Sequence, residues 1–148
     1  MTLTGSMTIV GVSNSVVNLF DKNDSAVADR GRINSSHAAV AYADNQLVTG
    51  FIEAKVGDVF TVKTDRANTA NNYVGAAYCW NENKEYIGAN MERAVTAWEW
   101  NSDYTEGAFT IPASYQFTTS NIANFEGTAY IRFCVAYTDM DSIVITKA

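Results

Sequence analysis

The segment Trp98-Glu99-Trp100 carries residue types that suit the binding of another molecule. Residues two apart share a face of an extended strand, so the two indole rings should lie together, with Tyr104 placed to join them. Flat aromatic rings among polar side chains match both the apolar C–H faces and the hydroxyl rim of a sugar ring. Tryptophan is also favoured at protein contacts, because it buries a large area and keeps one N–H donor. Three interpretations stay open: packing in the core, contact with a protein, and stacking on a glycan. The candidate contact residues are Trp98, Trp100, Tyr104, Glu99, Arg93 and Asn101.

Residues typical of catalysis are scarce. His37 is the only histidine, and no nucleophile motif surrounds it, so it is interpreted as a strand-edge or surface residue. Glycoside hydrolysis needs two carboxylates that converge on one cleft. The acidic pairs Asp139 with Asp141 and Glu82 with Glu85 are close in sequence and are typical of solvated turns. We therefore expect a protein that is not an enzyme.

A structural calcium ion is the one cofactor that the acidic residues leave open. Asp139, Asp141 and Asp24 could join carbonyl oxygens around calcium, because hard cations prefer oxygen ligands. The chain has no EF-hand spacing and no glycine-rich phosphate loop. The expectation is therefore that no cofactor is bound, with calcium as the alternative.

Two cysteines, Cys79 and Cys134, fall in predicted strands. A disulfide between neighbouring strands is one interpretation. Two buried free thiols are favoured, because the chain is not rich in cysteine and shows no export signal. No Cys/His spacing typical of a zinc site is present in the sequence.

The strongest strand signal runs from Tyr130 to Tyr137. Alternate residues from Ile131 to Tyr137 are apolar, which predicts one buried face. The opposite face is also largely apolar, so the strand should be central and covered on both sides. Arg132 on that second face needs a carboxylate, a carbonyl group or a position at the rim, and a structural ion pair is expected.

Other strand-like runs alternate with turn-forming residues, and one proline occurs in the whole chain. Segment 94–100 is open between a strand and a helical turn, and segment 21–36 is polar enough to predict an irregular loop. This spacing predicts an all-β fold, a single antiparallel β-sandwich. The predicted strands are 8–12, 16–19, 37–42, 51–55, 59–64, 73–80, 85–87, 107–111, 115–118, 129–137 and 141–146.

Several segments carry a resemblance to a known type of module. They are Asn18-Leu19-Phe20-Asp21-Lys22, the run from Phe51 to Val62, the run from Tyr78 to Ile87, Tyr115-Gln116-Phe117-Thr118, and the run from Gly127 to Phe133. In order and spacing the chain resembles the β-sandwich modules of bacteriophage tail, fibre and baseplate proteins and of bacterial surface proteins. These are similar in architecture to jelly-roll carbohydrate-binding modules, so the resemblance implies a β-sandwich of jelly-roll type. The proline that such modules often carry before the Tyr-Ile-Arg segment is absent here.

Length and charge narrow the classes of partner. A chain of 148 residues suits one domain, 1–148, in which residues 1–6 are a frayed end or an extension that docks on a neighbouring subunit. The net charge of −6 argues against nucleic acid and against an anionic membrane surface. No apolar run approaches the ~20 residues of a membrane span, and no secretory signal is visible.

Three functions from different classes follow. The resemblance implies a non-enzymatic structural or attachment component of a bacteriophage virion, in the tail, fibre, baseplate or head decoration. Its partners would be other virion proteins or further copies of itself, and a bacterial surface glycan. The alternative is a stand-alone carbohydrate-binding module on a bacterial surface or secreted, and a glycan hydrolase is the least supported.

Overall fold

The computed structural model describes residues 16–34 and 40–148. This part of the chain is built of strands and one short 3-10 helix, Met140–Ser142, and it contains no α-helix. The predicted strand 8–12, His37 and the extension 1–6 lie outside the described residues. The strands are β1 (Ala28–Ile33), β2 (Val40–Val48), β3 (Ile52–Glu53), β4 (Val59–Lys63), β5 (Ala76–Trp80), β6 (Tyr86–Met91), β7 (Trp98–Trp100), β8 (Glu106–Thr110), β9 (Ser114–Gln116), β10 (Ile122–Asn124), β11 (Tyr130–Ala136) and β12 (Val144–Lys147).

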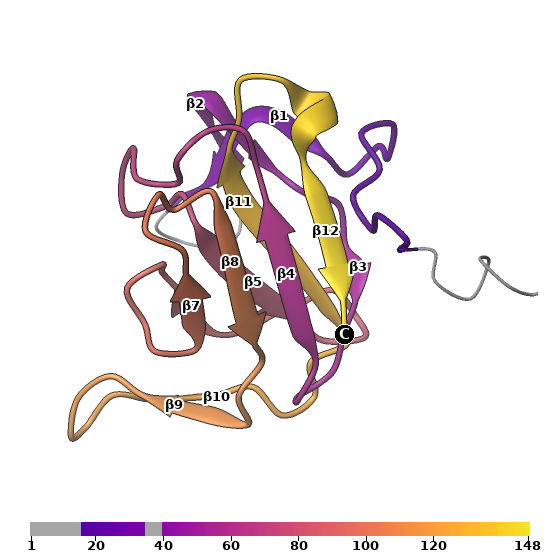
Figure 1. Cartoon of the computed structure of the whole chain (residues 1–148). Helices are drawn as coiled ribbons and strands as arrows, with labels where there is room; N and C mark the ends of the chain where they lie inside the picture. The colour runs from indigo at the N-terminus through magenta and orange to yellow at the C-terminus, as the bar shows by residue number, and fades with distance from the viewer. Residues whose placement is uncertain (1–15, 35–39) are drawn as a thin grey trace, which may run out of the picture.

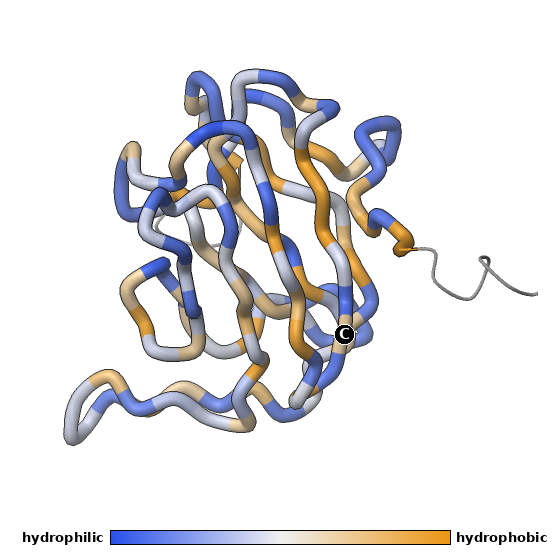
Figure 2. Tube along the Cα trace, viewed as in Figure 1, coloured by the Kyte–Doolittle hydropathy of each residue, from blue (hydrophilic) through white to orange (hydrophobic). Residues whose placement is uncertain are grey.

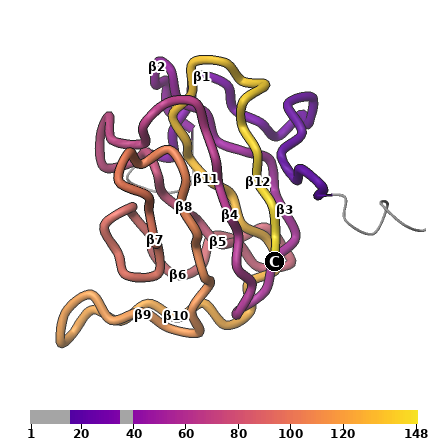
Figure 3. The backbone as a smooth tube through the Cα atoms, in the orientation of Figure 1, coloured from indigo at the N-terminus to yellow at the C-terminus, as the bar shows by residue number. Residues whose placement is uncertain are grey.

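Two antiparallel sheets face each other. The first has the order β1-β2-β11-β5-β6, with β3 also paired to β11, and the second has the order β12-β4-β8-β7. In Figure 1 the second sheet lies in front of β11 and β5. A separate hairpin, β9–β10, extends away from the two sheets, as Figure 3 shows. The predicted all-β antiparallel sandwich is confirmed.

The core between the sheets is organised around β11. Ile131, Phe133 and Val135 all belong to the main buried cluster, as their alternation predicts. Phe133 meets three rings of the opposite sheet in edge-on contacts: Phe60 at 5.6 Å, Trp98 at 5.9 Å and Phe109 at 6.3 Å between ring centres. Figure 2 shows hydrophilic residues concentrated in the loops at the top of the view and apolar residues along the strands. The central position predicted for this strand is confirmed.

The second face of β11 is covered as well, and it explains Arg132. This side chain is buried, and it donates from Nε to the carbonyl oxygen of Thr49 (2.8 Å) and from Nη2 to that of Ala26 (2.7 Å). Its guanidinium also lies 4.6 Å from the centre of the Phe51 ring. The prediction of an ion pair for Arg132 is wrong, because within the described residues backbone carbonyl groups hold its guanidinium. Burial lowers the pKa of this guanidinium.

Strand β1 replaces part of the loop predicted for segment 21–36. Its pairing with β2 is interrupted between Asp29 and Gly31, where Arg30 adopts a positive φ of 56°. Gly31 packs so closely on Val40 that a Cβ atom there would lie 2.6 Å from a methyl group. The polar Arg-Gly-Arg run is therefore a bulged edge strand, because edges accept bulges and charges.

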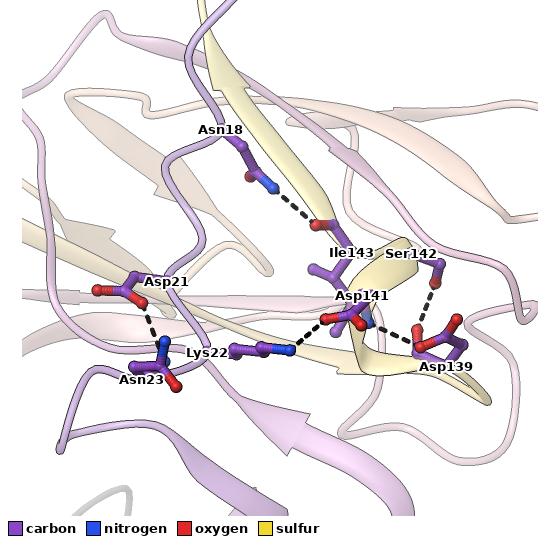
Figure 4. Close-up of polar contacts among 8 residues, drawn as sticks. All are labelled: Asn18, Asp21, Lys22, Asn23, Asp139, Asp141, Ser142 and Ile143. Carbon is purple, nitrogen blue, oxygen red and sulfur yellow. Dashed lines mark hydrogen bonds and ion pairs between the residues drawn. The ribbon is translucent and has the colours of Figure 1, made fainter.

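The predicted strand 16–19 is not a strand, yet its end is tied to the edge of the second sheet. Asn18 donates from Nδ2 to the carbonyl of Ile143 (2.9 Å) and accepts from the N–H of Ile145 (2.9 Å). The N–H of Leu19 donates to the carbonyl of Ile145 (2.7 Å). Figure 4 shows the Asn18–Ile143 bond beside the Lys22–Asp141 ion pair. The side chain of Asn18 thus forms hydrogen bonds with backbone groups at the edge strand β12 that would otherwise lack a partner within the sheet.

Asp65 anchors the loop that follows β4. Its carboxylate accepts hydrogen bonds from the backbone N–H groups of Thr138 (2.8 Å) and Asp139 (2.9 Å). The loss of some hydration raises the pKa of the exposed Asp65, but these bonds and the Ser142 hydroxyl outweigh it, so the pKa lies below its usual value. The ionised form of Asp65 is therefore part of the folded state.

Candidate functional site

The tryptophan pair lies on β7, at one edge of the second sheet. Trp98 pairs with Phe109 and Trp100 with Gly107, so both indoles face the core side of the sheet, where they stack with centres 4.5 Å apart. Trp98 is only 5% exposed, and its Nε1 donates to the carbonyl of Met91 (3.0 Å). Trp98 is thus a core residue, as one of the three interpretations held.

Trp100 differs from Trp98 because it is half-buried. Its ring covers Gly107, where a Cβ atom would lie 2.6 Å from the indole. Tyr104 lies 6.0 Å from Trp100 between ring centres and is 38% exposed. The Nε1 of Trp100 is buried and has no hydrogen-bond partner among the described residues. A contact surface at Trp100 and Tyr104 remains a prediction.

The polar candidates do not all gather around these rings. Glu99 points to the opposite, solvent-exposed face of β7, as its period-2 position requires. The Asn101 Oδ1 accepts from the N–H groups of Thr105 and Glu106, so its amide holds a turn. Arg93 donates to the carbonyl of Asn71 (2.6 Å). Glu99, Trp100 and Asn101 line a shallow depression of about 250 Å³, which Arg93 and Tyr104 do not line.

The three calcium candidates are held by separate contacts. Asp141 pairs with Lys22 at 2.7 Å, and Asp139 Oδ1 accepts from the Asp141 N–H, which caps the short 3-10 helix (Figure 4). Asp24 Oδ1 accepts from the N–H of Ala26. Within residues 16–34 and 40–148, no three His, Cys, Asp or Glu side chains gather as a metal site would need. The structure therefore does not bring Asp24, Asp139 and Asp141 together.

The two cysteines are free and buried. Ile131 pairs with Cys79, whereas Cys134 pairs with Ala76, so the thiols point to opposite faces of the first sheet. Burial raises the pKa of each thiol to about 12. The prediction of two buried free thiols is therefore confirmed.

A groove that the sequence did not predict opens beside β6. Ala77 pairs with Met91, but two residues later Cys79 pairs with Ile87, so residues 88–90 bulge opposite a single residue of β5. Gly88 has a positive φ of 77°, and a Cβ atom on it would lie 2.3 Å from the Phe125 ring. Only glycine fits this bulge, which interrupts the pairing of β6 with β5 between Ile87 and Met91.

The β9–β10 hairpin supplies the other wall of the groove. Its base is closed by the Phe125 N–H bond to the Ala113 carbonyl (2.9 Å), and its tip by Phe117 N–H to the Asn121 carbonyl (2.8 Å). The Phe117 ring packs against Tyr115, with centres 4.8 Å apart. The space between hairpin and bulge measures about 380 Å³. Its lining residues are Tyr86, Gly88, Ala89, Asn90, Phe117 and Asn121.

The groove has an uncharged lining with two aromatic rings and two amides. Burial raises the pKa of Tyr86, so its hydroxyl stays protonated at neutral pH. Asn90 donates from Nδ2 to Glu92 (3.3 Å), whereas its Oδ1 is buried and accepts no hydrogen bond within the described residues. Such an arrangement can hold an uncharged ligand that has an apolar face and hydroxyl donors.

A sequence signal for this groove existed in part. Gly88 follows an aromatic strand start, and an isolated glycine within a strand pattern indicates a bulge. The predicted strand ended at Ile87, however, so Asn90 was assigned to no element. Only one strand of the hairpin was predicted: segment 115–118 was predicted as a strand, but its partner β10 was not.

The described part of the chain has no helix that is long and apolar enough to cross a membrane. No protein-family model, no curated protein and no solved structure matches this chain.

Proposed function

We propose that the chain is a non-enzymatic structural and attachment component of a bacteriophage virion, with a jelly-roll architecture like that of carbohydrate-binding modules. It would work in the tail, fibre, baseplate or head decoration. Its partners would be other virion proteins or copies of itself, and attachment would include contact with a bacterial surface glycan. The place of work is the virion, after assembly in the bacterial cytoplasm.

Four of the five segments that carry the resemblance support this proposal, because they form connected parts of the sandwich frame, whereas the segment 115–118 lies in the separate β9–β10 hairpin. Asn18 accepts from the N–H of Ile145 at the edge strand β12, and the run 51–62 supplies β3 and most of β4. The run 78–87 supplies most of β5 and the start of β6, and 127–133 supplies the first half of β11.

The observation that carries the attachment role is the groove between β6 and the β9–β10 hairpin. It combines two half-exposed aromatic rings with two amides and has no ionised side chain in its lining. Pockets with a few polar groups between apolar walls are the usual form of small-ligand sites. A binding module needs such a surface and no reactive group.

Electron microscopy of the particle tests the proposal. An antibody against the purified chain should label one structure on phage particles made from the genome that encodes it. Light scattering of the isolated chain should show a defined oligomer. Labelling of the bacterial surface or recovery from the culture medium, with unlabelled particles, would instead favour the stand-alone carbohydrate-binding module.

A further inference from the structure

We propose that the groove between β6 and the β9–β10 hairpin binds one neutral sugar ring, an assignment that rests on the proposed attachment function and names its ligand class. The groove measures about 380 Å³, which lies at the lower end of the range of about 300–1,000 Å³ for small-molecule sites. A pyranose ring with part of its neighbour suits this space.

The aromatic walls select a ligand with an apolar face. Tyr86 comes from β6 and Phe117 from the hairpin, and both are half-buried. Tyr86 packs on Trp80, with ring centres 5.3 Å apart, and Phe117 packs against the main core cluster, so each ring is held while part of it stays open. Phe117 is further held by Tyr115, whose hydroxyl accepts from the N–H of Thr96 (3.1 Å). Rings fixed in this way contribute contact area with little loss of conformational entropy on binding.

The amides select hydroxyl groups. Asn90 Oδ1 lacks a donor, and a buried acceptor without a partner is unfavourable until one is supplied. The second side-chain torsion of asparagine is soft, so the amide can turn this oxygen toward a sugar hydroxyl in the groove. Asn121, exposed at the hairpin tip, offers a second amide because its hydrogen bonds involve only its backbone.

Charge disfavours acidic sugars. The lining has no cation, and the Glu92 carboxylate lies 3.3 Å from the Asn90 amide nitrogen. A uronate or sialate in the groove would bring a second negative charge near this one without a partner. The net charge of −6 adds to the repulsion. The ligand class is therefore neutral.

Nuclear magnetic resonance titration of the ¹⁵N-labelled chain tests the site. The probes are the methyl glycosides of glucose, galactose and N-acetylglucosamine, with glucuronate as the charged comparison. At least one neutral probe should give saturable shifts centred on the amides of Gly88, Ala89 and Asn121, and glucuronate should not. No saturable shift with any neutral probe, or shifts centred elsewhere, would overturn the assignment.

Variants make the test specific. Phe117→Ala should weaken binding at least tenfold, because aromatic groups at the centre of a contact dominate affinity. Asn121→Ala should weaken it several-fold and keeps the test valid if Phe117→Ala unfolds the hairpin. Ile122→Ala is the matched control, since Ile122 is exposed on the same hairpin and does not line the groove. Equal affinity of Asn121→Ala and the parent chain would contradict the proposed site.

The outcome separates this assignment from the virion proposal. A chain that labels particles but binds no neutral probe retains the structural role and loses the sugar site. A chain that binds a neutral sugar in the groove but is absent from particles retains the site and loses the virion role.

Discussion

Replacement of Asn68 by alanine should be among the most destabilising changes in the chain. Asn68 is fully buried in the loop after β4. Its Oδ1 accepts from the N–H of Ala136 (2.8 Å), and its Nδ2 donates to Thr64 Oγ1 (3.0 Å) and to the carbonyl of Tyr104 (3.0 Å). One side chain thus joins the end of β11 to two loops of the opposite sheet.

The magnitude follows from what each partner loses. The N–H of the buried Ala136 is left without an acceptor, and an orphaned buried donor costs about 1–3 kcal/mol. The two donated bonds add about 0.5–1.5 kcal/mol each. Tyr104 keeps the bond from the Asn68 backbone N–H, and Thr64 still donates to Arg66. The free energy of unfolding should therefore fall by about 4 kcal/mol.

Urea unfolding and thermal unfolding measure this change. At about 2–4 °C per kcal/mol for a chain of this size, the midpoint should fall by roughly 8–16 °C. Native-state hydrogen exchange should show the Ala136 amide protected in the parent chain and fast in the variant. Asn23→Ala, an exposed change, serves as the control and should leave stability unaltered. A loss below about 1 kcal/mol with a protected Ala136 amide would refute the reasoning, because the orphaned donor would then have another partner.

Three further predictions concern pH, thiol chemistry and the tryptophans. The folded-state pKa of Asp65 is depressed, so its contribution should be present above the unfolded pKa of about 4 and be lost as pH falls through the folded value. Asp65→Asn should flatten this part of the stability–pH curve, and an unchanged curve would contradict the role. Cys79 and Cys134 should resist a thiol reagent at neutral pH and react only in denaturant, because both are buried with raised pKa values; rapid labelling of the native chain would oppose this. Trp98→Ala should cost about 3–5 kcal/mol. Trp100→Ala should cost less and, if Trp100 contacts a neighbouring subunit, reduce the oligomer seen by light scattering; equal losses of stability would place both rings in the core.

The central strand β11 was predictable because the pattern that identifies it lies within its own sequence. Apolar residues alternate from Ile131 to Tyr137, and both faces of β11 are covered, so no long-range contact was needed to assign it. The partner of Arg132 was not predictable in the same way. Its acceptors, the carbonyls of Thr49 and Ala26, are backbone atoms that any residue type supplies. Sequence could state that this cation needs a partner, but not which one.

Strand β1 was missed because a bulge breaks its alternation. Arg30 in the left-handed region shifts the pairing between Asp29 and Gly31, so the residues on either side of it follow different patterns. Ile33 is buried and Arg32 half-buried, and the Arg32 guanidinium covers the Tyr73 ring at 4.2 Å. A period-2 test assumes an uninterrupted strand, so it fails at edges where bulges are favoured.

The candidate groove depends on two elements that are distant in sequence, and one glycine joins the groove to the core. Gly88 lies in the bulge that interrupts the pairing of β6 with β5, and the same residue lets the buried Phe125 ring approach from the end of the hairpin strand β10. A side chain at position 88 would therefore have to displace a core ring as well as adopt a strained backbone. The wall that Gly88 forms is thus fixed by the packing of the sandwich. On the hairpin, Phe117 packs partly against the core, whereas the side chain of Asn121 is exposed. A substitution at Asn121 should accordingly change the groove without disturbing the core, whereas a substitution at Gly88 should disturb both.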